Sequence, residues 1–262
     1  MDAVANPQLD QSLNAAAPAI VVKGLLKRYR EVIAVDSVAF TVAQGSFTAL
    51  LGGNGAGKTT TLAMLLGLVQ PTAGSIIILG EDFRLHAKSL LARMNFQSPY
   101  ADLPRRLTVR QNLTIYAHLY GVSHAQARIK ELATDLDLAL LLDRPLGELS
   151  AGQRTRAGLA KAFINTPKIV LLDEPTASLD PDTADWVRAF LARYAREVGA
   201  TFLIASHNML EVERLCDHVL MMRQGRIVDT GSPKSLIAKY GRTTLEDVFL
   251  EVARHGAREA AS

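Results

Sequence analysis

The chain has 262 residues, of which 48% are hydrophobic and 21% are charged, and it carries a net charge of +3. This composition is typical of a soluble globular protein, and the small, scattered positive excess gives no support to nucleic-acid binding. The single cysteine, Cys216, excludes an internal disulfide and favours a reducing compartment, and the longest apolar stretch, Thr61–Val69, is shorter than the ~20 residues that a bilayer requires.

The predicted elements begin after an N-terminal segment without apolar periodicity. Residues 1–18 are rich in Ala, Asn and Gln, so we expect a disordered tail there. From Ala19 onward, short apolar runs alternate with helical patterns, as in an α/β domain. The apolar runs predict strands at Ile20–Lys23, Val38–Val42, Thr48–Leu51, Ser75–Leu79, Ile169–Leu172, Thr201–Ala205 and Val219–Arg223. The helical patterns predict helices at Lys58–Val69, Ala151–Ile164, Thr183–Glu197 and Leu210–Cys216.

Two further regions are predicted to be purely helical. Between Thr108 and Leu142 no run has the pattern of a strand, so we expect a helical insert within the α/β core. Past Gly231 the pattern predicts two short helices, Pro233–Lys239 and Leu245–Arg254, followed by a tail of small residues.

A glycine-rich segment between a predicted strand and a predicted helix matches the phosphate-loop pattern G-x-x-x-x-G-K-S/T. Glycines let the backbone N–H groups turn inward around phosphates, and the following helix adds the positive end of its dipole. Lys58 can bridge the β- and γ-phosphates of a nucleotide, Thr59 can ligate magnesium, and Thr60 can contact the α-phosphate. The residues expected to bind the nucleotide are therefore Gly52, Gly53, Asn54, Gly55, Ala56, Gly57, Lys58, Thr59 and Thr60.

Two adjacent acids end the apolar run 169–172. Side chains alternate along a strand, so Asp173 and Glu174 point in different directions and can have different roles. Asp173 can hold magnesium, directly or through water, and Glu174 can act as general base toward the attacking water. The alternative is a strand end with two solvated acids, which the phosphate loop in the same predicted sheet makes the weaker interpretation.

The segment Leu149–Arg154, with the sequence LSAGQR, resembles the LSGGQ signature of ATP-binding-cassette (ABC) ATPases. Other family motifs follow in the expected order: Tyr29 at the A-loop position, Gln97 at the Q-loop, Ala177–Asp180 at the D-loop and Ser206-His207 at the H-loop. The resemblance covers roughly residues 20–250 and implies an α/β fold. That fold is a P-loop NTPase core with a mostly parallel sheet flanked by helices, an antiparallel N-terminal β subdomain and an inserted helical subdomain.

The resemblance also implies roles for single residues. Tyr29 stacks on adenine, and His207 contacts the γ-phosphate beside the base Glu174. Gln97 counts among both the catalytic and the metal-binding residues, because it ligates magnesium (with Thr59 and Asp173) or water and senses the γ-phosphate. The plain alternatives are a surface aromatic for Tyr29, a polar loop residue for Gln97 and a structural imidazole for His207. The signature residues act in trans, on the ATP of a second cassette paired head to tail, and these residues are Ser150, Ala151, Gly152 and Gln153.

The expected domain limits follow from the same resemblance: a tail at 1–18, the ATPase domain at 20–250 with a helical subdomain inserted at 98–150, and a C-terminal tail at 251–262. Three positions depart from the family pattern. Gly53 replaces a common proline, Ala151 replaces a glycine, and the loop from Gln97 to Arg106 is slightly long.

The implied function is that of a cytoplasmic ATPase subunit, with ATP and Mg²⁺ as cofactors, at the cytoplasmic face of the cell membrane. Its expected partners are an integral membrane permease, which provides the only membrane contact, and a second ABC ATPase, either another copy or a sister chain. The C-terminal segment Thr244–Leu250 resembles exporter-branch ATPases, which favours export. The alternative is a non-transport ABC ATPase in translation or DNA repair, although the single cassette and the absence of a long coiled-coil insert favour transport.

Overall fold

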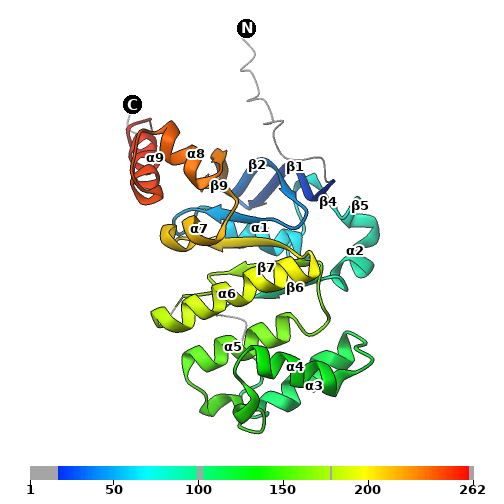
Figure 1. Cartoon of the computed structure of the whole chain (residues 1–262). Coiled ribbons are helices and arrows are strands. Elements are labelled where there is room, and N and C mark those ends of the chain that lie inside the picture. Colours follow the sequence, from blue (N-terminus) through cyan, green and yellow to red (C-terminus); the bar gives the residue numbers. More distant parts are fainter. Residues whose placement is uncertain (1–16, 99–102, 178, 260–262) are drawn as a thin grey trace.

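The computed structural model describes residues 17–98, 103–177 and 179–259, in which strands are layered with helices (Figure 1). Most of the expected N-terminal tail, residues 1–16, lies outside this part of the chain. So do residues 99–102 of the loop after Gln97, Ser178 of the D-loop and the last three residues. No helix within the described ranges is both long and apolar enough to cross a bilayer.

The described strands form two sheets, one antiparallel and one mostly parallel. The first has the order β2-β1-β4-β5, and the second has the order β10-β9-β3-β8-β7-β6. The bounds of the first sheet are β1 (Pro18–Tyr29), β2 (Val32–Ala43), β4 (Ala73–Ile78) and β5 (Glu81–Asp82). The bounds of the second are β3 (Phe47–Leu51), β6 (Met94–Gln97), β7 (Ile169–Asp173), β8 (Thr201–Ser206), β9 (His218–Arg223) and β10 (Arg226–Gly231).

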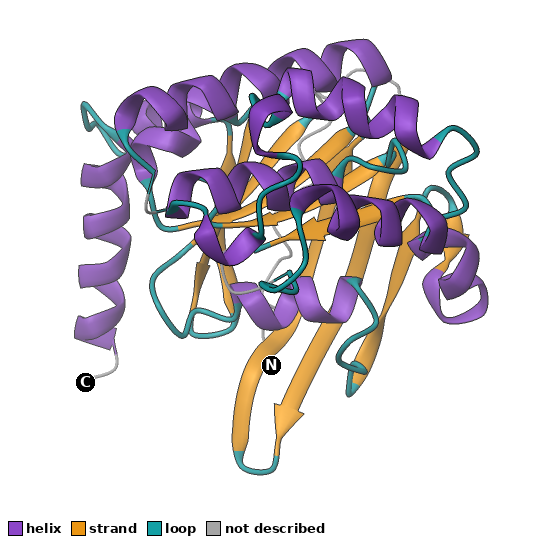
Figure 2. Ribbon diagram, turned by 90° about the horizontal axis from the view of Figure 1, so that it is seen from below, coloured by secondary structure: helices purple, strands orange, loops and turns teal. Residues whose placement is uncertain are grey.

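Helices cover the parallel sheet, and Figure 2 shows them crossing in front of the strands when the molecule is seen from below. The helices of the core are α1 (Lys58–Leu65), α2 (Phe83–Leu91), α5 (Ala151–Ala162), α6 (Pro181–Val198), α7 (Met209–Leu215), α8 (Pro233–Lys239) and α9 (Leu245–Glu259). The segment before α5 carries α3 (Val109–Leu119), α4 (Ala125–Asp135) and two short 3-10 turns, Ala139–Leu141 and Leu146–Glu148. The described fold thus has the predicted class, an α/β core with an antiparallel subdomain and a helical insert.

The core has two halves, one on each face of the parallel sheet. In β3, Leu50 packs with the antiparallel sheet and α1, while Ala49 and Leu51 face the helices on the other side. This division follows from the alternation of side chains along a strand. Because both faces are covered, β3, β7 and β8 are buried along their whole length, as expected for parallel strands.

Three strands and one α-helix have no counterpart among the predictions: β5, β6, β10 and α2. In β6, the polar side chains of Asn95 and Gln97 are almost completely buried, so the strand lacks a continuous apolar pattern. No residue of β10 is fully buried because it lies at the sheet edge. Helix α1 ends at Leu65 rather than at the predicted Val69, since Gly67 follows with φ +68°, a conformation that ends helices.

The two ends of the folded region differ from the expected domain limits. Strand β1 begins at Pro18, one residue inside the expected tail, and it pairs with Ala43 of β2. Helix α9 continues to Glu259, beyond the limit expected at residue 250. Val252 packs on the core and its carbonyl accepts a hydrogen bond from Arg223 at 2.5 Å, so packing supports the helix past that limit.

Candidate active site

The candidate site lies where four neighbouring parallel strands end. Strands β3, β8, β7 and β6 are adjacent, with Leu51 opposite Ser206 and Gln97 opposite Leu172. The segments that follow β3, β8 and β7 are the phosphate loop (Gly52–Thr59), the Ser206-His207 turn and the Asp173-Glu174 pair. The carboxyl ends of parallel strands are where α/β proteins bind ligands, so this edge gathers the predicted motifs in one place.

The phosphate loop is shaped by close backbone approach. Gly57 has φ +102°, and a Cβ at this position would lie 2.6 Å from the carbonyl oxygen of Ala34, so both conformation and space require glycine. Helix α1 starts at the next residue and has no side-chain cap at its N-terminus. Its first backbone N–H groups therefore remain available to an anion such as a phosphate.

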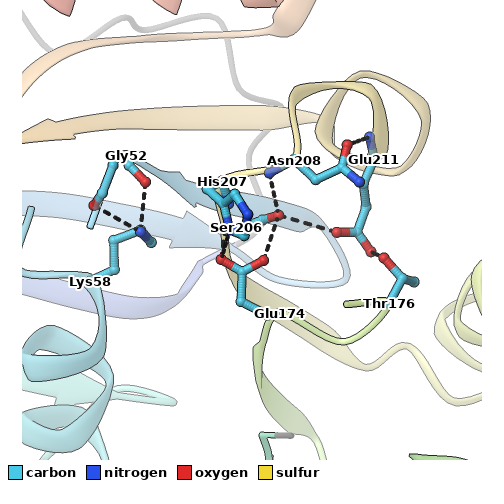
Figure 3. A network of polar contacts seen from close by, with 9 residues as sticks. Gly52, Lys58, Glu174, Thr176, Ser206, His207, Asn208 and Glu211 are labelled. Atoms are coloured by element: carbon cyan, nitrogen blue, oxygen red, sulfur yellow. Dashed lines mark hydrogen bonds and ion pairs between the residues drawn. The ribbon is translucent and has the colours of Figure 1, made fainter. Parts of the chain in front are cut away.

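Lys58 is buried within the loop, with 8% of its surface exposed. Its Nζ donates hydrogen bonds to the carbonyl oxygens of Gly52, at 2.6 Å, and Gly53, at 3.1 Å (Figure 3). Burial lowers the pKa of Lys58, while the negative charges of Glu174 and Asp173 act in the opposite direction. The ammonium group is thus close to both acids of the predicted carboxylate pair.

Asp173 ends β7 and is 5% exposed. Burial, and then the charge of Glu174, raise the pKa of Asp173, whereas Lys58 and a hydrogen bond with the Thr59 side chain lower it. A carboxylate and a hydroxyl that already contact one another are oxygen ligands of the kind that magnesium prefers. These two residues therefore fit the predicted metal site.

Glu174 turns away from Asp173 through an unusual backbone conformation, with φ +51°. Its backbone N–H donates to Ala205 of β8 at 2.9 Å. One carboxylate oxygen, Oε1, accepts the backbone N–H of His207 at 3.1 Å and lies 2.5 Å from Nδ1 of the His207 ring. The side chain of Glu174 is 15% exposed, whereas that of His207 is 61% exposed. Figure 3 shows the two side chains in contact with one another.

Gln97 is the last residue of β6, and its side chain is buried within the fold. The side chain is buried against the signature helix α5, and its Nε2 donates to the carbonyl oxygen of Ser98 at 3.1 Å. A Cβ on Gly158 of α5 would lie 2.4 Å from that nitrogen, so only glycine leaves room for the amide in this position.

Tyr29 ends β1 in the hairpin with β2, and its ring is 45% exposed. The ammonium of Lys27 lies 4.7 Å from the ring centroid, a cation–π contact that holds one face of the ring. The same hairpin touches the phosphate loop through Ala34 and Gly57. The ring is thus exposed on a hairpin that contacts the loop.

The signature segment (Leu149–Arg154) forms the beginning of α5. Ser150 is the N-cap: its Oγ accepts the backbone N–H of Gln153 at 3.2 Å, and the Gln153 side chain accepts the N–H of Ser150 at 2.9 Å. Ala151 occupies the first helical position, where a methyl group causes no strain. Ser150 and Ala151 are exposed and Gly152 is half-buried. The segment therefore presents a helix N-terminus to the outside of the molecule.

The predicted C-terminal motif Thr244–Leu250 reaches the phosphate loop through one aromatic side chain. A Cβ on Gly53 would lie 4.0 Å from the Phe249 ring, and a cavity of about 200 Å³ beside this contact is lined by both residues. Because 4.0 Å is an ordinary contact distance, a Cβ at Gly53 would be accommodated beside the Phe249 ring.

Sequence reasoning missed two polar residues, Thr176 and Glu211, which are connected to Glu174 and His207 by hydrogen bonds through Ser206. The carboxylate of Glu211 is 2% exposed, and it contacts the hydroxyl groups of Thr176 and Ser206 at 2.6 and 3.2 Å. The available signal was weak: Thr176 follows the two acids, and Glu211 lies in the first turn of a short helix. Figure 3 shows the chain of contacts, which runs from Thr176 to Glu211, from Glu211 to Ser206 and from Ser206 to Glu174.

The chain is similar to known proteins in both sequence and structure. The model of the ABC transporter family matches residues 35–177. The Nod factor export ATP-binding protein I of Burkholderia lata is 41% identical over 246 residues, which cover 87% of this chain and 79% of that protein. The protein of the same name from Rhizobium sp. is 38% identical over 237 residues, covering 88% and 76% respectively.

Solved structures with the same fold include two described as transporter components. An ATP-binding subunit of an ABC transporter superposes with a TM-score of 0.81 and 26% identity, covering 90% of this chain and 99% of that one. CbiO1 from Clostridium perfringens, described as part of the ABC transporter complex CbiONQ, superposes with a TM-score of 0.76 and 27% identity, covering 93% and 99%. These matches confirm the predicted ATPase activity and the binding of ATP, and they do not favour a role in translation or DNA repair.

Proposed function

Because this chain belongs to the ABC transporter family, as one of its ATP-binding ATPases, we propose that it powers a separate membrane permease that works in export. The observation that carries this proposal is the assembly of the phosphate loop, Asp173, Glu174 and His207 at one sheet edge, together with an exposed signature segment. Export is supported by the names of the relatives at 38–41% identity and by the motif Thr244–Leu250.

ATP occupies the phosphate loop with its phosphates toward Lys58 and its adenine toward the exposed ring of Tyr29. On binding, Lys58 exchanges its hydrogen bonds to Gly52 and Gly53 for contacts with the β- and γ-phosphates. Thr59 and Asp173 would hold Mg²⁺, which neutralises charge on the phosphate oxygens when it is bound. Gln97, at the end of the neighbouring strand β6, would add a further ligand to magnesium or to its water.

Hydrolysis requires a base beside the γ-phosphate, and Glu174 is placed for this role. Its side chain is 15% exposed, and its carboxylate is oriented by two contacts with His207. Glu174 takes a proton from the attacking water, and the exposed His207 ring contacts the γ-phosphate and helps to place that water. Such a base contributes ~10²–10⁴-fold to the rate.

Two cassettes are needed for a complete site. The N-terminus of α5 carries exposed backbone N–H groups, the Ser150 hydroxyl and no acidic side chain in its first turn. A helix N-terminus of this kind favours an anion. In a head-to-tail pair, Ser150, Ala151, Gly152 and Gln153 of one subunit cover the γ-phosphate held by the other, so ATP links the two subunits.

The proposal places the protein on the cytoplasmic face of the cell membrane, attached through its permease. Purification of the tagged chain from its native membrane is the test: we expect an integral membrane protein to co-purify in a fixed ratio, and we expect its transport to stop in the Lys58→Ala background. Recovery of the chain only on ribosomes or DNA would exclude the transport function.

A further inference from the structure

A buried acid lies behind the proposed catalytic pair. Glu211 is in the first turn of α7, with its backbone N–H bonded to the N-cap side chain of Asn208 at 3.1 Å. Its side chain is almost completely buried, which raises its pKa, and a nearby Glu174 adds negative charge. A buried carboxyl group is costly unless hydrogen bonds stabilise it, so its partners indicate why the chain keeps it there.

The two oxygens of Glu211 contact two different segments of the chain. Oε1 accepts the hydroxyl of Thr176 at 2.6 Å, and Oε2 accepts the hydroxyl of Ser206 at 3.2 Å. Thr176 is two residues after Glu174, and Ser206 directly precedes His207. Glu211 therefore connects the segment that carries the proposed base to the segment that carries its histidine partner (Figure 3).

The single proton of the Ser206 hydroxyl has two possible acceptors. It lies 3.2 Å from Glu211 and 3.5 Å from Glu174, and the shorter distance favours donation to Glu211. The same oxygen accepts the backbone N–H of Asn208 at 3.0 Å. Ser206 thus donates a hydrogen bond to Glu211 and accepts one from the backbone N–H of Asn208. These two hydrogen bonds fix the turn in which the backbone N–H of His207 donates to Glu174.

We propose that Glu211 is a positioning residue of the ATPase site, which acts through Ser206 and Thr176 to hold Glu174 and His207 in their catalytic orientation. This inference rests on the proposed roles of Glu174 and His207. The side chain of Glu211 is almost completely buried and its two oxygens accept the hydroxyl groups of Thr176 and Ser206, so its effect on turnover passes through these groups. Small displacements of reacting groups slow a reaction strongly, since a shift of about 1 Å can lower the rate ~10²-fold.

The test is a double-mutant cycle on kcat with Glu211→Gln and Ser206→Ala in the full-length chain. Glutamine keeps the size of the side chain but offers one acceptor oxygen in place of two, so one of the two hydroxyl contacts must change. We expect kcat to fall by ~10- to 100-fold, with the KM for ATP nearly unchanged. Because Glu211 acts through Ser206, Glu211→Gln should reduce kcat by a much smaller factor in the Ser206→Ala background than in the original chain.

The matched control is Glu213→Gln on the same helix. The Glu213 carboxylate accepts the backbone N–H of Leu245 at the start of α9 rather than a hydroxyl of the site, and a glutamine can replace that contact. We expect this variant to keep the kcat of the original chain. Thermal unfolding of all variants distinguishes a positioning role from a purely structural one. If Glu211 were only structural, its replacement would lower the melting temperature and the ATP affinity together, and its effect on kcat would not be coupled to that of Ser206→Ala.

The inference is overturned if Glu211→Gln retains full kcat, or if its effect and that of Ser206→Ala simply add. Glu174→Gln, measured in parallel, separates this result from a failure of the proposed function. If Glu174→Gln turns over ATP normally, the base assignment itself is wrong, whatever Glu211 does. If Glu174→Gln is inactive while the cycle shows no coupling, only the role of Glu211 is refuted.

Discussion

Glu174 has a backbone conformation that few residues other than glycine adopt, with φ +51° immediately after a buried strand. Such a conformation costs ~1–3 kcal/mol and persists only where the surroundings enforce it. Here the hydrogen bond from its N–H to Ala205 enforces it, and the carboxylate is directed at His207 instead of following Asp173. The strain directs two adjacent acids to different places, one proposed to bind the metal ion and the other proposed to act as the base.

Glu174→Gln is expected to bind ATP and to lose turnover by ~10²–10⁴-fold, because an amide cannot accept a proton from water. The amide oxygen still accepts the backbone N–H of His207, so the loop should keep its shape. Steady-state ATPase measurements and equilibrium ATP binding check this pair of effects. Glu197→Gln, an exposed acid near the end of α6, is the control and should behave as the original chain does.

At the scale of the elements, two helices begin with the same hydrogen-bond motif but face different surroundings. Thr108 and Gln111 form a capping box at α3, and Ser150 and Gln153 form one at α5. The α3 box lies in the helical insert, while the α5 box is the signature segment. The pair therefore offers a way to separate the capping role of the signature serine from its proposed contact with ATP across the dimer.

Ser150→Ala and Thr108→Ala should each lower the free energy of unfolding by ~0.5–2 kcal/mol, the usual cost of losing an N-cap hydroxyl. Chemical denaturation measures this common effect. Only Ser150→Ala should also reduce ATPase activity and ATP-dependent dimerisation, because only that hydroxyl is proposed to face a γ-phosphate. Equal loss of activity in both variants would show that helix stability, and not a contact in trans, explains the result.

At the scale of the whole molecule, the phosphate loop and the signature belong to different layers. The loop follows β3 in the sheet, whereas the signature begins α5, below the sheet in Figure 1. Head-to-tail pairing with two-fold symmetry gives each site one loop and one signature from different subunits. A variant with a defective loop and a variant with a defective signature should therefore complement one another.

Lys58→Ala removes the phosphate contact, and Gly152→Asp places a negative charge where the partner's γ-phosphate is proposed to lie. A Cβ on Gly152 would make only ordinary contacts, the nearest at 3.7 Å, and an acid suits the first turn of a helix, so the second variant should fold. Each variant alone should be inactive. A mixture should regain activity, because each mixed dimer contains one intact site. If the ATPase activity of the mixture is no higher than the summed activities of the two separate variants, pairing between copies of this chain is contradicted.

Much of the site was predictable from the sequence because its motifs are local. The phosphate loop, the acids after an apolar strand and the signature each depend on a few consecutive residues whose backbone and side chains act together. Buried parallel strands were predictable for a similar reason, since β3, β7 and β8 are apolar along most of their length. The polar strand β6 and the edge strand β10 were not, because their burial depends on neighbours far away in the chain.

The sequence by itself therefore determined the chemistry of this protein: a loop for phosphates, a pair of acids and a signature that implies a second subunit. Only the tertiary structure decided which residues meet. The strand order β3-β8-β7-β6 places His207 against Glu174, and Gly158 of α5 leaves the space that the Gln97 amide occupies. It also places Glu211 behind both catalytic segments. Short local motifs specify which groups react. The distances between these groups depend on packing between segments that are far apart in the sequence.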